Sequence, residues 1–290
     1  MLKHTFIHVR GIGETSEQKL WARGVLDWDY LASLPLDSLP QRCRKALPST
    51  IDESRAALAR LDACWFAQRL PSRHHWRLYP TFRDKTAFLD IETTGMGPDS
   101  AVTTIALYDG QTIRTYVRDQ NLHEFPLDIQ SYRMVVTYNG RCFDIPFLER
   151  EFPNLRFTQP HCDLRYLLAS LGYKGGLKGC EQKLGLPRPQ ALRDVDGFIA
   201  VLLWQQHVRG DSRALPALLR YNIEDAVNLQ WLMETAYNLA LARLPIHVDR
   251  VEVSQRPYIN WPFEPAIIDE ILGRTDAFQP HWSVKPRLWH

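Results

Sequence analysis

The chain has 290 residues, of which 45% are hydrophobic and 23% are charged, a balance that is typical of folded globular proteins and excludes a disordered chain. Its formal net charge of +2 is nearly neutral, which excludes a protein that binds nucleic acid through overall charge alone. Any affinity for phosphate groups must therefore come from local charge or from bound metal.

The cysteines and the apolar runs exclude further classes. The five cysteines form no CxxC pair, so neither a disulfide framework nor a zinc ribbon is predicted. The longest apolar run, residues 198–204, is too short to span a bilayer. The first residues lack the apolar core and the small-residue cleavage site of a signal peptide. We therefore expect a reduced, cytoplasmic protein without a membrane segment.

Residues 1–85 are predicted to be a helical N-terminal segment. A turn, Gly11-Ile12-Gly13, resembles the turn of a helix-hairpin-helix motif, whose backbone amides can bind a phosphate, although a single GxG is a weak signal. A helix is expected to follow it at residues 14–23, with Gly24 as its C-cap.

The second half of this segment contains one more predicted helix. It covers residues 52–70 and follows Ser49 and Thr50, which are suitable capping residues. Residues 71–83 are rich in histidine, arginine, proline and aromatic side chains, and this composition indicates a linker or a packed loop.

The pattern changes to short β-rich runs near residue 85. The candidate strands are residues 86–92, 101–108, 112–117, 134–138 and 161–163. Asp109-Gly110 is a strong hairpin-turn signal between the second and third runs, and a short helix is expected at residues 144–151. Hairpin strands followed by strands alternating with helices predict an α/β fold, a mixed sheet flanked by helices, over residues 86–243. Residues 244–290 form a tail with many prolines and tryptophans and little periodicity.

The first strand ends in two carboxylates, Asp90 and Glu92. Side chains two residues apart on a strand point to the same face, so these two lie together. Neighbouring carboxylates repel unless a cation lies between them, and their oxygen atoms are ligands that suit Mg²⁺ or Mn²⁺. A solvated acidic strand end is the alternative interpretation of this pair.

Two later motifs carry further acids. Asp144 follows a strand and a turn and begins a predicted helix, where a simple N-cap is the alternative interpretation. Tyr221 and Asp225 are four residues apart in a helical stretch, so they share one helix face. The alternative interpretation of this pair is that Tyr221 is a half-buried aromatic side chain and that Asp225 is a surface charge without a function.

Taken together, these motifs resemble those of the DEDD exonuclease superfamily, in the variety with tyrosine in its third motif. More closely, the chain is similar to the YprB-like group of ribonuclease H-like domains. The similarity extends to Gly176-Leu177-Lys178, Leu184-Gly185 and Leu219-Arg220-Tyr221-Asn222, and covers about residues 85–240.

The resemblance implies a ribonuclease H-like fold and a 3′→5′ exonuclease that uses two Mg²⁺ or Mn²⁺ ions. It makes Asp90, Glu92, Asp144 and Asp225 the metal-binding acids and Tyr221 the residue that orients the attacking water. Tyrosine has a pKa near ~10 and is a poor base at neutral pH, whereas a metal ion can lower the pKa of water to about 7. We therefore expect a metal ion rather than Tyr221 to deprotonate the water. The resemblance implies that Asp90, Glu92 and Asp225 hold this ion, and that Asp90 holds a second ion with Asp144, the latter through water.

Six further residues are candidates for substrate contacts: Thr93, Thr94, Met96, Asn139, Phe143 and Lys178. Lys178 belongs to a cationic stretch that also contains Lys174, Lys183 and Arg188 and that can follow a phosphate backbone. A solvated helix face is the alternative for this stretch, and core packing is the alternative for Phe143.

Other polar residues near these motifs receive supporting roles. Asp163 is a candidate acid behind the metal ligands, and Asp194 and Asp196 are predicted helix N-caps. His161 is predicted to be structural. Glu224, which is adjacent to Asp225, is expected to point away from the site.

The expected partner is nucleic acid, DNA or RNA, with a single-stranded 3′ end. Two alternatives remain open: a catalytically inactive nucleic-acid-binding module, and an endonuclease that uses the same metal site. No particular protein partner is indicated by the sequence.

Overall fold

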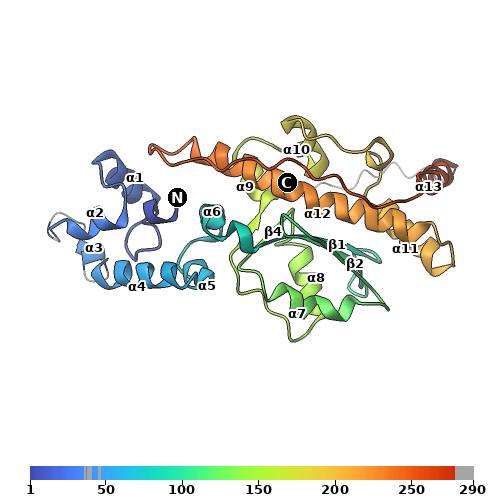
Figure 1. Ribbon diagram of the computed structural model, residues 1–290, viewed down its shortest axis with the longest axis horizontal. Coiled ribbons are helices and arrows are strands. Elements are labelled where there is room, and N and C mark those ends of the chain that lie inside the picture. The colour runs from blue at the N-terminus through green and yellow to red at the C-terminus, as the bar shows by residue number, and fades with distance from the viewer. Residues whose placement is uncertain (36, 38–40, 45–46, 278–290) are drawn as a thin grey trace.

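The computed structural model describes residues 1–35, 37, 41–44 and 47–277, except for the side chains of residues 42, 43 and 274–277. A five-stranded sheet with the order β3-β2-β1-β4-β5 lies at its centre, with helices on both faces (Figure 1). Its strands are β1 (Thr86–Thr93), β2 (Val102–Tyr108), β3 (Ile113–Val117), β4 (Met134–Thr137) and β5 (His161–Asp163). The predicted α/β class and the predicted strands are therefore confirmed.

The strands run in mixed directions. β1 pairs antiparallel with β2, and β2 pairs antiparallel with β3 through the predicted hairpin at Asp109-Gly110, where Gly110 has a φ of +92°. β4 and β5 extend the sheet on the other side of β1 and are parallel to it. The carboxyl ends of β1, β4 and β5 consequently meet at one edge of the sheet, which is where polar groups from different strands can converge.

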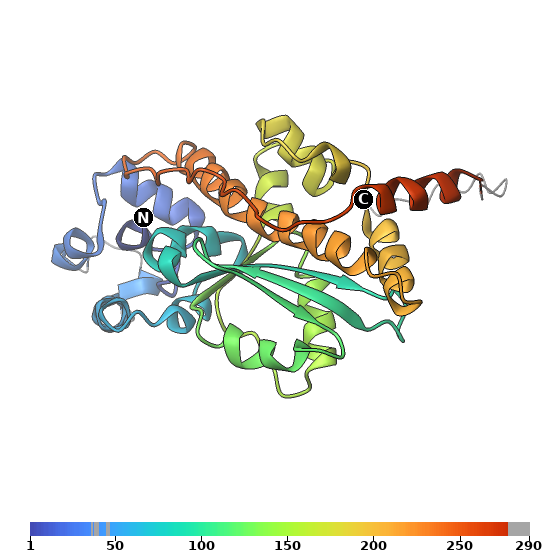
Figure 2. The ribbon, with the colours of Figure 1, turned by 45° about the vertical axis from the view of Figure 1, so that its right-hand side comes forward.

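Each face of the sheet is covered by its own helices. Alternation along β1 places Phe88 in the cluster beneath α12 (Ala214–Leu241), whereas Leu89 and Ile91 pack on the opposite face. That opposite face is covered by α7 (Phe125–Ile129) and α8 (Asp144–Glu151), shown in Figure 2 beneath the strands. Asp90 and Glu92 therefore point toward α12. Neither α12 nor any other helix in the described part of the chain is long and apolar enough to cross a membrane.

Further helices surround α12 on its own side of the sheet. They are α9 (Leu164–Ser170), α10 (Gly176–Leu184), the 3-10 helix η6 (Gln190–Leu192), α11 (Gly197–Val208) and α13 (Ala266–Ala277), and a short 3-10 helix η5 (Leu122–Glu124) precedes α7. The segment between α12 and α13 runs back along α12 (Figures 1 and 2). Two hydrogen bonds hold it there: the side-chain amide of Asn238 donates to the Val251 carbonyl, and the backbone amide of Ser254 donates to the Glu234 carboxylate.

The N-terminal segment is helical, as predicted. Its elements are η1 (Leu2–His4), α1 (Glu14–Ala22), α2 (Trp28–Ser33), α3 (Gln41–Arg44), α4 (Leu47–Ala59), α5 (Ala63–Ala67), η3 (Ser72–Leu78), α6 (Tyr79–Phe82) and η4 (Arg83–Lys85). The Gly11–Gly13 turn lies between η1 and α1, and Gly24 ends α1 with a φ of +81°. Buried residues of this segment belong to the same hydrophobic cluster as Phe88 and α12.

Two predictions about local structure in this segment are wrong. The helix expected at residues 52–70 starts earlier, at Leu47, and breaks after Ala59, so that Ser49 and Thr50 lie inside α4. The break occurs because Leu61 has a φ of +51° and Asp62 caps a new helix, accepting a hydrogen bond from the Trp65 amide at 3.0 Å.

The segment at residues 71–83 is also neither a linker nor a loop. It forms η3 and α6, because its aromatic and apolar side chains, including Trp76, Tyr79 and Phe82, are buried in the core. In the tail, helix α13 was not predicted. It forms because Ile267, Ile268 and Ile271 pack against α11 in one cluster. Residues 278–290 of the predicted tail lie outside the described residues.

Candidate active site

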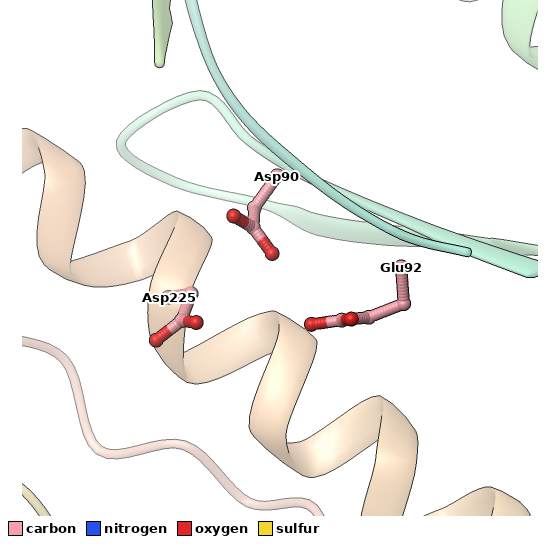
Figure 3. Close-up of side chains that lie close together, drawn as sticks. All are labelled: Asp90, Glu92 and Asp225. Carbon is pink, nitrogen blue, oxygen red and sulfur yellow. The ribbon is translucent and has the colours of Figure 1, made fainter. Parts of the chain in front are cut away.

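Three carboxylates converge between β1 and α12: Asp90, Glu92 and Asp225, here called the acidic cluster. One oxygen atom of each lies within 4.8 Å of the others, which is close enough for one metal ion to bind all three. Figure 3 shows Asp90 and Glu92 extending from the strand toward the helix that carries Asp225. The period of two on β1 explains the first pair, and the packing of α12 on the sheet supplies the third acid.

The acidic cluster has an unfavourable charge balance. Burial and the negative charges of Asp225 and Glu92 raise the pKa of Asp90 well above its ordinary value. Burial and the charge of Asp225 likewise raise the pKa of Glu92. Carboxylates held together under such mutual repulsion are stabilised in the ionised form by a cation between them, and their hard oxygen atoms fit Mg²⁺ or Mn²⁺.

Asp144 lies near the acidic cluster but is not a member of it. Burial raises the pKa of Asp144 to about 8, while hydrogen bonds from its own backbone amide and that of Ile91 act in the opposite direction. The negative charge of Asp144 also raises the pKa values of Asp90 and Glu92. The N-cap interpretation of Asp144 is wrong, because Phe143 occupies the N-cap of α8 and Asp144 is the first helical residue.

Asn222 orients the Asp90 carboxylate. Its amide nitrogen donates to Asp90 Oδ2 at 2.7 Å, and its amide oxygen accepts from the Thr104 hydroxyl at 3.0 Å. Asn222 is fully buried, so its hydrogen bond with Thr104 is buried, whereas its hydrogen bond with Asp90 is partly buried. Sequence reasoning did not assign it a role, although its position three residues before Asp225 places it on the same face of α12.

A buried ion network orients Asp225. Arg188 donates to Asp225 Oδ1 and makes two hydrogen bonds to Glu181, of 3.0 and 2.8 Å. Asn228 donates to Glu181 at 2.8 Å. The side chains of Arg188 and Glu181 are only 5% and 3% exposed. The prediction that Arg188 belongs to a cationic surface is therefore wrong, because its guanidinium group faces inward to two carboxylates.

Tyr221 faces the acidic cluster from one turn before Asp225 on α12, so the predicted shared helix face is confirmed. Burial raises the pKa of Tyr221 well above its ordinary value, and the charges of Asp225, Glu92 and Asp90 raise it further. Two cations flank its ring, with Lys178 Nζ at 5.3 Å and the Arg188 guanidinium carbon at 5.9 Å from the ring centroid.

The three substrate-contact candidates that follow Glu92 are arranged differently. Thr93 is buried and its hydroxyl donates to the Gly95 carbonyl at 2.7 Å. Thr94 is exposed, and its hydroxyl accepts from the Ala101 amide at 3.0 Å. Met96 is 85% exposed, so its side chain is available to an incoming ligand.

The other three candidates are partly engaged with the protein. Asn139 has a φ of +69°, and its side-chain oxygen accepts from Arg165 at 2.6 Å. The Phe143 ring packs on Phe147 with 4.7 Å between centroids, consistent with a core-packing role. Lys178 donates to backbone carbonyls, one of them that of Arg193 at 3.0 Å, so its ammonium group is not on a solvated helix face.

The supporting residues mostly match expectation. Asp163 accepts hydrogen bonds from the Asn139 and Arg141 amides and caps α9, which fixes the turn that leads to Asp144. Asp196 caps α11, as predicted, whereas the prediction that Asp194 is an N-cap is wrong, because Asp194 lies in the bend before the helix. His161 is structural, and bonds to Thr137 at 2.8 Å. Glu224 points away from the acidic cluster and pairs with Arg220 and Arg256.

The comparison with protein families agrees with this architecture. A model of the RNase H superfamily matches residues 87–237. No curated protein sequence matches the chain. Among the solved structures that match is the family B DNA polymerase from the hyperthermophilic archaeon Pyrobaculum calidifontis, with 15% sequence identity and a TM-score of 0.42. That match covers 53% of this chain and 25% of the polymerase, so the chain spans about a quarter of the polymerase's length.

Proposed function

Because the chain belongs to the RNase H superfamily, which indicates a nuclease, we propose that it hydrolyses phosphodiester bonds as a metal-dependent 3′→5′ exonuclease on single-stranded DNA or RNA. The observation that carries the proposal is the convergence of the acidic cluster with Tyr221. A scaffold without a catalytic role gains nothing from three adjacent carboxylates, two of them buried, in mutual repulsion, because that arrangement is destabilising without a cation.

The donor set fits divalent metal ions. Asp90, Glu92 and Asp225 would hold one Mg²⁺ or Mn²⁺ ion, and Asp90 with Asp144 would contribute to a second. When bound, such ions lower the pKa of water and stabilise the charge on the departing 3′-oxygen. Other side chains orient these carboxylates and the attacking water.

Tyr221 has the properties of a hydrogen-bond donor rather than a base. Since burial and the neighbouring carboxylates raise its pKa, its hydroxyl keeps its proton at neutral pH. It can therefore hold a water molecule beside the acidic cluster by hydrogen bonding. Asn222 and Arg188 fix the orientations of Asp90 and Asp225 on either side of that position.

The proposal is tested with 5′-labelled single-stranded DNA and RNA in Mn²⁺ or Mg²⁺. The wild type is expected to produce a ladder that shortens from the 3′ end, and EDTA should abolish it. Mutations of residues that only support metal ligands cost about 10- to 100-fold, so Asp90→Asn, which removes a ligand charge, should lose at least about 100-fold. Asp84→Asn, an exposed acid just before β1, serves as the matched control and should retain activity.

Other results would redirect the assignment. Cleavage of a closed single-stranded circle would show an endonuclease, because an exonuclease requires an end. Binding of the oligonucleotide without any metal-dependent hydrolysis would show a nucleic-acid-binding module and would contradict the proposed activity.

A further inference from the structure

A cleft of about 610 Å³ lies between the N-terminal segment and the β5 edge of the sheet. Its walls come from η3, β5, α9, the end of α12 and the turn after β4. Its cationic, imidazole and aromatic lining includes Arg73, His75, Arg141, His161, Tyr166 and Arg243. We call this the basic cleft. None of these side chains belongs to the acidic cluster or to its supporting network.

The charge of the basic cleft is unbalanced. Its two acidic lining residues are already engaged: Glu14 pairs with Arg73 and His74, and Asp163 accepts backbone hydrogen bonds. Arg141 and Arg243 are exposed, and within the described residues they donate to a serine hydroxyl and to backbone carbonyls rather than to a carboxylate. Two uncompensated guanidinium groups in one concave surface suit the phosphates of a polyanion.

An exposed aromatic ring lies on the same wall. Tyr166 on α9 is 48% exposed, and its hydroxyl is 3.1 Å from the thiol of Cys142. Cations interleaved with an accessible aromatic ring are the combination with which proteins bind single-stranded nucleic acid, through phosphate contacts and base stacking. The ring distinguishes such a strand from other polyanions, which have no bases to stack.

One turn connects the basic cleft to Asp144, which lies near the acidic cluster. Arg141 on the cleft wall is three residues before Asp144, so their Cα atoms are at most about 11 Å apart. Asp163 holds this turn by accepting from the Arg141 amide at 3.0 Å. We propose that the basic cleft binds the nucleotides of a single strand that precede its scissile 3′ end, with Arg141 and Arg243 on phosphates and Tyr166 stacked on a base. This inference rests on the proposed function.

The test measures the affinity of the full-length protein for fluorescent DNA and RNA oligonucleotides of graded length, from dinucleotide to dodecamer, by anisotropy in EDTA. The wild type should gain affinity as the oligonucleotide becomes long enough to reach the cleft. Tyr166→Ala should weaken dodecamer binding by about 5- to 100-fold and reduce the gain with length. Arg141→Ala and Arg243→Ala should each reduce the slope of log affinity against log salt by about 0.7.

Two matched variants serve as controls. Tyr30→Ala removes a tyrosine that is 50% exposed on α2, outside the cleft. Arg114→Ala removes an arginine from β3, at the opposite edge of the sheet. Both should bind the dodecamer like the wild type, and thermal denaturation should show that every variant is folded.

The possible failures are separable. In the first case, the wild type hydrolyses oligonucleotides while the cleft variants show the same increase in affinity with oligonucleotide length as the wild type. That result would overturn the inference about the cleft and leave the proposed nuclease activity intact. Equal binding of inorganic polyphosphate and oligonucleotide, with no effect of Tyr166→Ala, would also overturn it. If the wild type neither binds nor hydrolyses any oligonucleotide, the proposed function itself fails.

Discussion

At the scale of single residues, the ligands of the acidic cluster depend on neighbours that fix their orientation. Asn222 orients Asp90 through a partly buried hydrogen bond, and Arg188 orients Asp225 through a buried one. Such supporting residues matter because a carboxylate that rotates freely must be ordered again each time a cation binds. Both side chains are buried, so we expect both to act by positioning the acids.

Asn222→Ala should lower nuclease activity by about 10- to 100-fold, because Asp90 loses its hydrogen bond from α12. Metal titration of the activity should show a shift to higher metal concentration. Asn238, which lies on the same helix about 24 Å beyond Asn222, provides the control, because Asn238→Ala gives up two hydrogen bonds with the backbone of Val251. If both variants lose activity equally, general destabilisation explains the loss and the positioning role is refuted.

Asp144 makes the stability of the metal-free protein depend on pH. Its pKa is about 8 in the folded state and 3.8 ordinarily, so between these values the native protein carries a proton that the unfolded chain lacks. The free energy of unfolding therefore falls as pH rises from about 4 to about 8. Below about pH 4, Asp144 does not change the free energy of unfolding, and above about pH 8 it lowers that free energy by its full amount.

Asp144→Asn should remove this dependence. In EDTA, the melting temperature of Asp144→Asn minus that of the wild type should increase by several degrees as the pH rises from about 5 to about 8. Each kcal/mol shifts Tm by about 2–4 °C in a chain of this size. Thermal denaturation across the window checks this. A constant difference between the two proteins at every pH would contradict it.

At the scale of elements, the turn between β4 and α8 determines where Asp144 lies. Gly140 in this turn packs directly on Thr137: a Cβ at Gly140 would lie 2.2 Å from the Thr137 hydroxyl oxygen and 2.6 Å from its Cβ. The Gly140 amide also donates to that hydroxyl at 3.1 Å. Only glycine fits this close approach without moving the turn.

Gly140→Ala should therefore destabilise the protein by about 1–3 kcal/mol and lower nuclease activity by at least about 10-fold, because the turn and Asp144 must shift. Gly197→Ala is the control, since a Cβ there meets nothing within 4 Å at the start of α11. Thermal denaturation and the nuclease assay test both variants. Wild-type behaviour of Gly140→Ala would show that the turn adapts.

At the scale of the whole molecule, the acidic cluster couples the sheet to α12. Its repulsion opposes the packing of these two elements, so a divalent cation that binds only the folded state should stabilise the entire fold. At about 100 times its dissociation constant, the cation contributes about 2.7 kcal/mol, or roughly 5–10 °C in melting temperature.

Melting curves with Mg²⁺, Mn²⁺ and EDTA check this expectation. Asp90→Asn should lose most of the metal-dependent rise, whereas Asp84→Asn should keep it. An unchanged melting temperature of the wild type at several millimolar metal would contradict the cation site.

Features that depend on local periodicity could be predicted from the amino-acid sequence alone. The period of two on β1 placed Asp90 with Glu92, and the four-residue spacing placed Tyr221 with Asp225 on one face of α12. Asp109-Gly110 determined the hairpin of the mixed sheet because its turn chemistry is local. These patterns are enough to predict the α/β class and the two local pairs, whereas the expectation that Asp225 joins Asp90 and Glu92 came from the family resemblance.

The contacts between distant segments became known only from the tertiary structure. It turned Arg188 inward to Asp225, selected Asn222 as the partner of Asp90, and left Asp144 outside the acidic cluster. It also made a helix of residues 266–277, whose isoleucines are buried only because α11 lies against them. Burial and ion pairing of this kind depend on which elements meet in space, and the spacing of residues along the chain does not specify that.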